Sequence, residues 1–238
     1  MKKSLFLFLI ASYLVFAGAT FAQGLNVKSA ELSLSMGETS FSSKTFTIGP
    51  PQSSTPINGS MELSSGKMYE ARVNFYNSKR IGSEVLYGYQ YGGVTFRRTS
   101  DPVSSFSSPL QVHTLTLNIL YYPFGETSSG WHPFITFGGG ARIYRPSAGG
   151  QRAAKDPLQG NFDTFFETTR GTGTVGIGVK RPITKSIGFR ADAGADFTKV
   201  PTFGLPESSA QANATVLPVG GIVHSIRASA GIIFYLGK

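Results

Sequence analysis

The chain has 238 residues, a length that suits one domain, and a formal net charge of +9. It contains no cysteine, so disulfides, thiolate chemistry and a cysteine zinc site are excluded. Glycine is plentiful at 29 residues, roughly 12% against a usual 7% or so. Beyond the N-terminal segment no apolar run approaches the roughly 18 residues of a membrane-spanning helix, so we expect none in the mature chain.

The first 22 residues have the pattern of a secretory signal peptide. Lys2 and Lys3 form its positive region, an apolar stretch runs from Leu5 to Phe16, and Ala22 ends a small-residue cleavage site. The alternative is an N-terminal membrane anchor, but the apolar stretch is short for a span and no stop-transfer pattern follows. We therefore expect residues 1–22 to be cleaved and residues 23–238 to form the mature domain.

Eight segments have apolar and polar residues at alternate positions, which is the period of a β-strand. In the last segment, for example, Ile226, Ile232 and Phe234 belong to the apolar set and Arg227 to the polar set. A strand of about ten residues that is apolar on one face and polar on the other suits a tilted transmembrane strand. The predicted strands are Ala30–Met36, Lys67–Asn77, Ser83–Phe96, Val112–Tyr121, Phe134–Tyr144, Thr172–Lys180, Ile187–Thr198 and His224–Leu236.

The connections between these segments alternate between long and short. Long extracellular loops, short periplasmic turns and an even number of strands are typical of outer-membrane barrels, and only closure satisfies every backbone group of a sheet in lipid. We therefore predict an all-β, eight-stranded antiparallel up-and-down transmembrane β-barrel over residues 23–238. The long connections are Gly37–Gly66, Arg97–Leu110, Arg145–Thr169 and Lys199–Val223, and the short ones are Ser78–Gly82, Tyr122–Pro133 and Arg181–Ser186.

A soluble up-and-down barrel of the lipocalin type is the main alternative, because its strands alternate as well, with the apolar face inside. The polar face separates the two hypotheses. It carries glycines such as Gly176, Gly178 and Gly194 among charged residues, and small residues leave room for long side chains to cross a narrow lumen. The apolar face carries Tyr and Phe near the strand ends. We therefore prefer the membrane barrel.

Two stretches resemble a known family. The chain end, with Ser229, Gly231, Phe234 and Leu236, is similar to the polar-x-Gly-x-x-apolar-x-apolar ending of bacterial outer-membrane barrels. The segment Leu115–Tyr144, with NILYYPFG and then PFITFGGGA, resembles a central hairpin of the porin-family group related to the OmpA and OmpX barrels. The resemblance implies insertion by the barrel-insertion machinery, with those four C-terminal residues as the signal. It implies no catalytic residue, because the group includes anchors and adhesins, and we expect no periplasmic domain.

Charged residues of both signs occur at inward positions on neighbouring strands. We interpret them as ion pairs that fill a water-poor lumen, because eight strands enclose an interior just wide enough for side chains. The alternative is a narrow, weakly selective pore or a gated switch. The predicted lumen charge network consists of Glu70, Arg72, Glu84, Arg142, Lys180, Arg190, Asp192, Asp196 and Arg227.

Support for catalysis is weak. A lipid A deacylase of the outer membrane would have His-x-Ser/Thr on a strand, and neither His113 nor His224 is followed by Ser or Thr at that position. His132 is expected in a solvated turn. Asp192 and Asp196 would lie about 13 Å apart along one strand, too far for a paired acid–base site. We predict a protein that is not an enzyme and has no cofactor or metal.

One long loop offers a candidate binding surface. Within Arg145–Thr169, the basic residues Arg152 and Lys155 accompany aromatic residues such as Phe165. Basic and aromatic residues together suit contact with lipopolysaccharide or a host surface, and the segment could also extend a strand above the membrane. The alternative, which we slightly prefer, is that Thr164–Arg170 simply leads into the sixth strand.

The positive charge completes the sequence-based expectations. A basic chain can bind nucleic acid, but in an exported protein the counter-charges are lipid headgroups and lipopolysaccharide phosphates, and a scattered solvated excess explains the charge better than either. We predict a monomer in contact with outer-membrane lipid and lipopolysaccharide, without nucleic acid. Its expected role is structural or surface-binding, and a narrow porin-like pore for small solutes is the alternative.

Overall fold

The computed structural model describes residues 30–42, 44–48, 57–98, 105–125, 130–156, 164–204 and 221–236. The predicted signal peptide lies outside these ranges. None of the described helices is long and apolar enough to cross a membrane. The strands are β1 (Ala30–Phe41), β2 (Lys44–Ile48), β3 (Ile57–Leu63), β4 (Gly66–Tyr76), β5 (Ile81–Arg98), β6 (Ser105–Tyr121), β7 (His132–Pro146), β8 (Thr168–Pro182), β9 (Ile187–Lys199) and β10 (Ile222–Leu236), and the helix is α2 (Ala148–Lys155).

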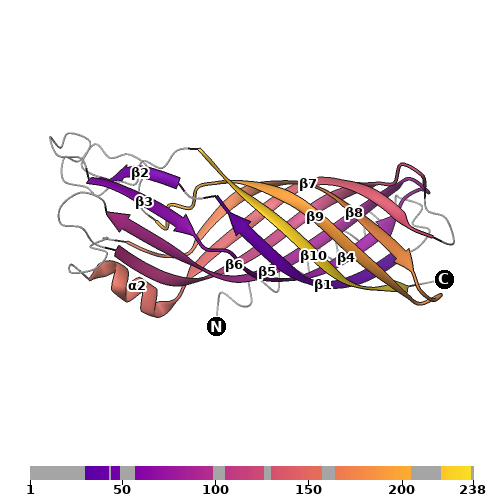
Figure 1. The fold of residues 1–238 in the computed structure, drawn as a ribbon, viewed down its shortest axis with the longest axis horizontal. Coiled ribbons are helices and arrows are strands. Elements are labelled where there is room, and N and C mark those ends of the chain that lie inside the picture. Colours follow the sequence, from indigo (N-terminus) through magenta and orange to yellow (C-terminus); the bar gives the residue numbers. More distant parts are fainter. Residues whose placement is uncertain are drawn as a thin grey trace.

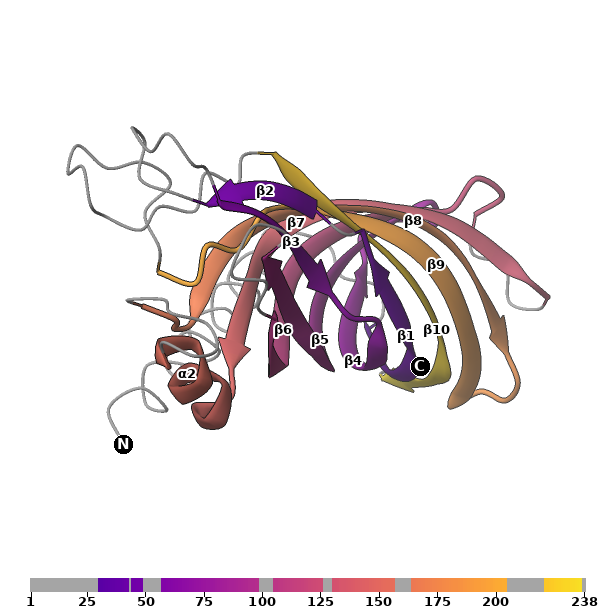
Figure 2. The ribbon, with the colours of Figure 1, turned by 60° about the vertical axis from the view of Figure 1, so that its left-hand side comes forward.

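Eight of the strands close into a barrel in which all neighbouring pairs are antiparallel. The order around the barrel is β1, β4, β5, β6, β7, β8, β9 and β10, and β10 pairs with β1 from Ala30–Leu236 to Phe41–Ser225. Consecutive strands are therefore neighbours, apart from the excursion through β2 and β3. The predicted eight-stranded up-and-down barrel is confirmed, and its tilted strands are visible in Figures 1 and 2.

Around the middle of the barrel, charged and polar side chains point inward and large apolar side chains point outward. On β4, Glu70 and Arg72 are buried, whereas the adjacent Tyr69 is 48% exposed. On β8, Ile177 is 65% exposed. A soluble barrel has the reverse arrangement, because exposing so many large apolar side chains to water is unfavourable. An apolar outer band is stable when hydrocarbon surrounds it. This distribution excludes the lipocalin-type alternative.

The two ends of the barrel differ. The start of β1, the end of β10 and the strand ends that the three short connections join lie at one end, called here the turn end. The strand ends that the four long connections join lie at the other, the loop end (Figure 1). The turn-end connections join β4 to β5, β6 to β7 and β8 to β9. This alternation of lengths follows the prediction.

The loop end contains more strand and helix than the sequence indicated. The predicted loop Gly37–Gly66 includes the end of β1 and the β2–β3 hairpin. Strand β3 of this hairpin pairs with the last residues of β5, Val94–Arg98. The predicted loop Arg97–Leu110 includes the start of β6, which continues the β5–β6 ribbon to the pair Arg97–Ser105. Helix α2 lies within Arg145–Thr169. These segments are rich in Ser and Gly, so their apolar period is too weak to predict a strand.

An apolar cluster fills the loop end of the barrel, and we call it the aromatic cap. Its rings pack closely: the centroids of Phe165 and Phe203 are 4.7 Å apart, and those of Phe106 and Phe165 are 5.2 Å apart, edge to face. The cap joins barrel strands to α2 and to the loops. Its buried members are Met61, Leu63, Val94, Phe96, Phe106, Leu110, Val112, Tyr144, Ala154, Phe165, Val200, Phe203 and Val223.

Candidate functional site: the charged interior of the barrel

Below the aromatic cap, the interior contains buried charges of both signs. The structure places all nine residues of the predicted lumen network there, and it adds a tenth, Glu31. The set is balanced, with the acids Glu31, Glu70, Glu84, Asp192 and Asp196 and the bases Arg72, Arg142, Lys180, Arg190 and Arg227. Inward side chains come from every second position of each strand, and this alternation places all ten side chains in the lumen.

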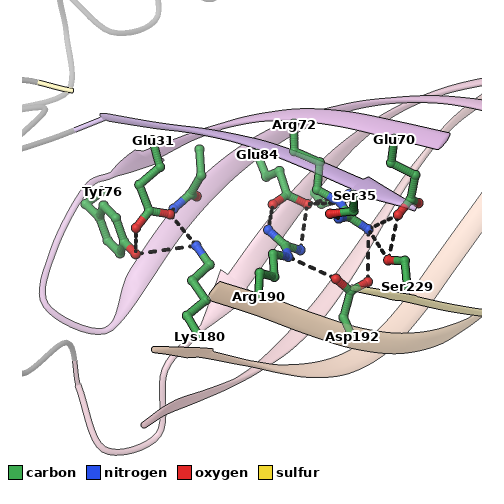
Figure 3. Close-up of polar contacts among 12 residues, drawn as sticks. Glu31, Ser35, Glu70, Arg72, Tyr76, Glu84, Lys180, Arg190, Asp192 and Ser229 are labelled. Carbon is green, nitrogen blue, oxygen red and sulfur yellow. Dashed lines mark hydrogen bonds and ion pairs between the residues drawn. The ribbon is translucent and has the colours of Figure 1, made fainter. Parts of the chain in front are cut away.

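Arg72 lies at the centre of the set (Figure 3). Its guanidinium pairs with Glu70 on the same strand and, across the lumen, with Asp192 of β9 at 2.9 Å. It also donates hydrogen bonds to the hydroxyls of Ser35 at 3.0 Å and Ser229 at 3.3 Å. One planar group therefore links four strands, β1, β4, β9 and β10, which suits a side chain with five donors in a fixed geometry.

Arg190 forms the second link across the barrel. It pairs with Glu84 of β5 through both terminal nitrogens and with Asp192 at 2.9 Å. Its guanidinium lies 4.8 Å from the centroid of the Phe134 ring, a distance for a cation–π contact. Gly178 makes room for that ring, because a Cβ there would lie 2.3 Å from Phe134 Cζ. The glycine on the polar face thus allows a bulky side chain inside the lumen.

Towards the loop end, Arg142 and Arg227 hold Asp196. Arg142 of β7 pairs with Asp196 of β9 and donates to Ser225 Oγ of β10 at 2.9 Å. Arg227 lies 3.4 Å from Asp196 and 3.0 Å from Glu70. Glu70 therefore connects this layer to the central one around Arg72.

Towards the turn end, Lys180 occupies an aromatic cage. Its ammonium pairs with Glu31 of β1 and donates to the hydroxyl of Tyr122 at 2.9 Å. It also lies 5.3–5.7 Å from the ring centroids of Tyr76, Tyr122 and Phe134. Tyr76 in turn donates to Glu31 at 2.7 Å, as Figure 3 shows. Glu31 was absent from the predicted network, although it lies on the polar face of the first predicted strand.

Five of these ten ion pairs join strands that are not neighbours in the sheet. Lys180–Glu31 links β8 to β1, Arg190–Glu84 links β9 to β5, and the pair of Arg72 with Asp192 links β4 to β9. A buried charge without a partner is strongly unfavourable, and partners with additional hydrogen bonds offset that cost. The arrangement therefore braces the barrel wall from inside.

One small cavity lies between the central charges and the loop end. Its volume is about 10 Å³, room for about one water. Its lining includes Gln90 and Thr116 together with Arg142 and Arg227. Gln90 Nε2 and Thr116 Oγ1 are buried without a hydrogen-bond partner in the protein. The cavity therefore has polar atoms without a protein partner beside a space of about one water.

The four C-terminal residues that resemble an insertion signal divide between the two faces of β10. Phe234 and Leu236 lie outside, 37% and 50% exposed, where lipid would contact them. Ser229 lies inside and donates to Glu70 at 2.8 Å. A Cβ on Gly231 would lie 2.0 Å from the carbonyl oxygen of Leu34 on β1. Gly231 therefore has a structural role at the seam where β1 and β10 pair, and Ser229 has one in the lumen.

The three histidines lie on different elements. His113 Nδ1 is 2.9 Å from the hydroxyl of Tyr87 on the neighbouring strand, and the ring of His224 packs edge-on against Phe197. His132 was expected in a solvated turn, and that expectation is wrong. It is the first residue of β7 and is buried. It pairs directly with Lys180 of β8, so its side chain points into the lumen on the same face as that of Lys180.

Comparison with known proteins adds the class of fold. No protein-family model and no curated protein matches the sequence. Among solved structures, the outer membrane protein OprG from Pseudomonas aeruginosa is similar with a TM-score of 0.58 at 10% identity, over 88% of this chain and 96% of that one. Outer membrane protein AlkL (TM-score 0.48, 10% identity, 89% and 92%) and Neisserial surface protein A (0.45, 12%, 86% and 96%) also match.

The likeness to OprG, at this level of identity, concerns the fold. The chain is an eight-stranded barrel of the type found in small outer-membrane proteins. Its apolar outer surface fits a barrel whose outer band is surrounded by hydrocarbon.

Proposed function

We propose that this protein is an integral outer-membrane barrel whose lumen is closed by its own charged side chains and whose role is structural or surface-binding. The observation that carries the proposal is the balanced set of five buried acids and five buried bases, paired across the lumen. A selective pore is lined by rings of one charge or by carbonyl oxygens. Here each charge faces an opposite charge, and eight strands leave little space beside them.

Order at the loop end supports a surface role. Ser147 caps the N-terminus of α2 by accepting a hydrogen bond from the Gly150 amide at 3.0 Å, and Ala154 of α2 belongs to the aromatic cap. Arg152 and Lys155 are exposed on this helix. We propose that such bases contact lipopolysaccharide phosphates, since opposite charges attract at an exposed surface and Arg and Lys bind phosphate well.

The remaining parts of the proposal concern export and assembly. A signal peptide over residues 1–22 would be removed, and residues 23–238 would form the mature barrel. The barrel-insertion machinery would recognise the C-terminal strand through Phe234 and Leu236, which the fold leaves on the outer face. Because closure leaves the barrel strands without a free edge, we propose that the protein is a monomer.

Conductance in planar bilayers tests the closed lumen. We expect the refolded protein to give no steady channel, because the paired side chains leave room for only about one water in the cavity described above. Replacing Arg72 and Asp192 together by alanine removes a central pair without leaving a net charge, and we expect a leak conductance to rise. A stable, ion-selective conductance of the unmodified barrel would instead establish the pore.

Cysteine labelling tests the orientation, and the absence of native cysteine makes each reporter clean. On intact cells, we expect an impermeant thiol reagent to label a cysteine at Arg152, which is exposed at the loop end, and not one at Lys185, which is exposed in a turn. After permeabilisation both positions should label. Equal labelling of the two positions on intact cells would contradict the proposed orientation.

A further inference from the structure

The turn end of the barrel has an unbalanced positive charge. In the described residues of its three connections and the adjoining strand ends, the exposed charges are Lys79, Arg80, Arg181 and Lys185, and all four are basic. At the loop end, the exposed charges include acids such as Glu38 and Glu62, and Arg145 pairs with Glu167 at 2.7 Å. The balanced interior contributes nothing to the excess, so the described part of the turn end presents bases without acids.

These bases alternate with exposed apolar side chains. The Arg181 guanidinium lies 5.1 Å from the Trp131 ring centroid, and Trp131 is 55% exposed. The Tyr122 amide donates to the Arg80 carbonyl at 2.9 Å, which places the turn containing Phe124 beside the first turn. Phe124 is 79% exposed, and Ile183, in the same turn as Lys185, is 67% exposed. The rim is thus both cationic and apolar.

We propose that this rim, the basic collar formed by Lys79, Arg80, Arg181 and Lys185, binds anionic phospholipid headgroups in the membrane leaflet at the turn end. Aromatic and aliphatic side chains at this height enter the region between headgroups and acyl chains. The arginine and lysine side chains lie on the water side of this region and contact the headgroup phosphates. Anionic lipids attract such basic segments within a Debye length. The inference rests on the proposed location of the barrel in a membrane.

Charge complementarity selects the occupant. A neutral lipid offers the apolar side chains the same environment but gives the four bases no net counter-charge. An anionic phospholipid satisfies both halves of the rim, because its acyl chains cover Trp131, Phe124 and Ile183 while its phosphate approaches the neighbouring cations. The collar should therefore enrich anionic lipid around one end of the barrel.

Trp131 is the only tryptophan of the chain and lies within the collar, so it reports on the adjoining lipid. The protein is refolded into phosphatidylcholine vesicles that contain a fixed share of phosphatidylglycerol, with bromine on the acyl chains of one lipid at a time. We expect brominated phosphatidylglycerol to quench Trp131 as if its association constant were about five times that of phosphatidylcholine. High salt should reduce this preference.

Two triple variants separate the collar from charge in general. Replacing Lys79, Arg80 and Lys185 by serine should abolish the preference while leaving Arg181 on Trp131. The matched control replaces three exposed bases of the loop end, Lys67, Arg97 and Lys199, by serine and should retain it.

Other outcomes would overturn the inference. Equal quenching by the two brominated lipids means that the collar does not select anionic lipid, although the barrel is inserted. No quenching by either lipid means that the barrel does not span the bilayer, so the proposed function fails with it. Added glycerol phosphate should not change the quenching, and a loss of preference would show that the site takes a free phosphate instead.

Discussion

Replacing Arg190 by methionine should lower the unfolding free energy of the barrel by about 3–5 kcal/mol, the cost of breaking a buried ion pair from one side. The substitution leaves Glu84 without its main partner, and Glu84 is 2% exposed. Methionine is flexible and can fill the space beside Phe134, so the loss comes from the uncompensated carboxylate. Urea unfolding in vesicles, followed by Trp131 fluorescence, measures the change.

Two further variants identify the cause. Combining Arg190→Met with Glu84→Gln restores the charge balance, and we expect it to recover about half of the loss or more, because contacting residues are coupled. Arg145→Met breaks the exposed pair with Glu167 and should cost about 0–1 kcal/mol. If Arg190→Met were as mild as Arg145→Met, the interior charges would not brace the barrel.

The alternation of apolar and polar residues was sufficient to predict the barrel, because side chains of a strand point to opposite faces at each step. The same parity predicted which charged residues point inward. It could not predict their partners. Arg72 and Asp192 are 120 residues apart, and whether they meet depends on the tilt and stagger of the strands, which no single segment encodes.

The loop end shows where sequence patterns are insufficient. Helix α2 has the sequence AGGQRAAK, whose two glycines disfavour a helix, and it is stabilised by the Ser147 cap and by Ala154 in the aromatic cap. Phe165 and Phe203 lie in connections, where no period indicates burial, yet they form the centre of that cluster. In such segments the structure is decided by packing against the rest of the protein, so the local sequence is not sufficient to predict it.

A single methyl group at Gly231 should destabilise the barrel by about 3 kcal/mol or more, at the upper end of overpacking effects. The Cβ of alanine would lie 2.0 Å from the Leu34 carbonyl oxygen and 2.6 Å from Ser35 Cα. Both are backbone atoms of β1, so no side-chain rotation relieves the contact, and β1 must move away from β10. That displacement would weaken the pairing that closes the barrel. Refolding yield in vesicles and urea unfolding measure the effect.

Gly173→Ala is the matched control, because a Cβ there meets nothing within 4 Å. The same chemical change should then be neutral or stabilise the strand by about 0.5 kcal/mol, since alanine loses less backbone entropy than glycine. The comparison also separates two roles of Gly231, which belongs to the C-terminal stretch that resembles an insertion signal. Vesicles contain no insertion machinery, so a defect there is structural. If Gly231→Ala refolded as well as Gly173→Ala in vesicles and failed only in cells, recognition of the C-terminal strand, rather than closure of the seam, would require this glycine.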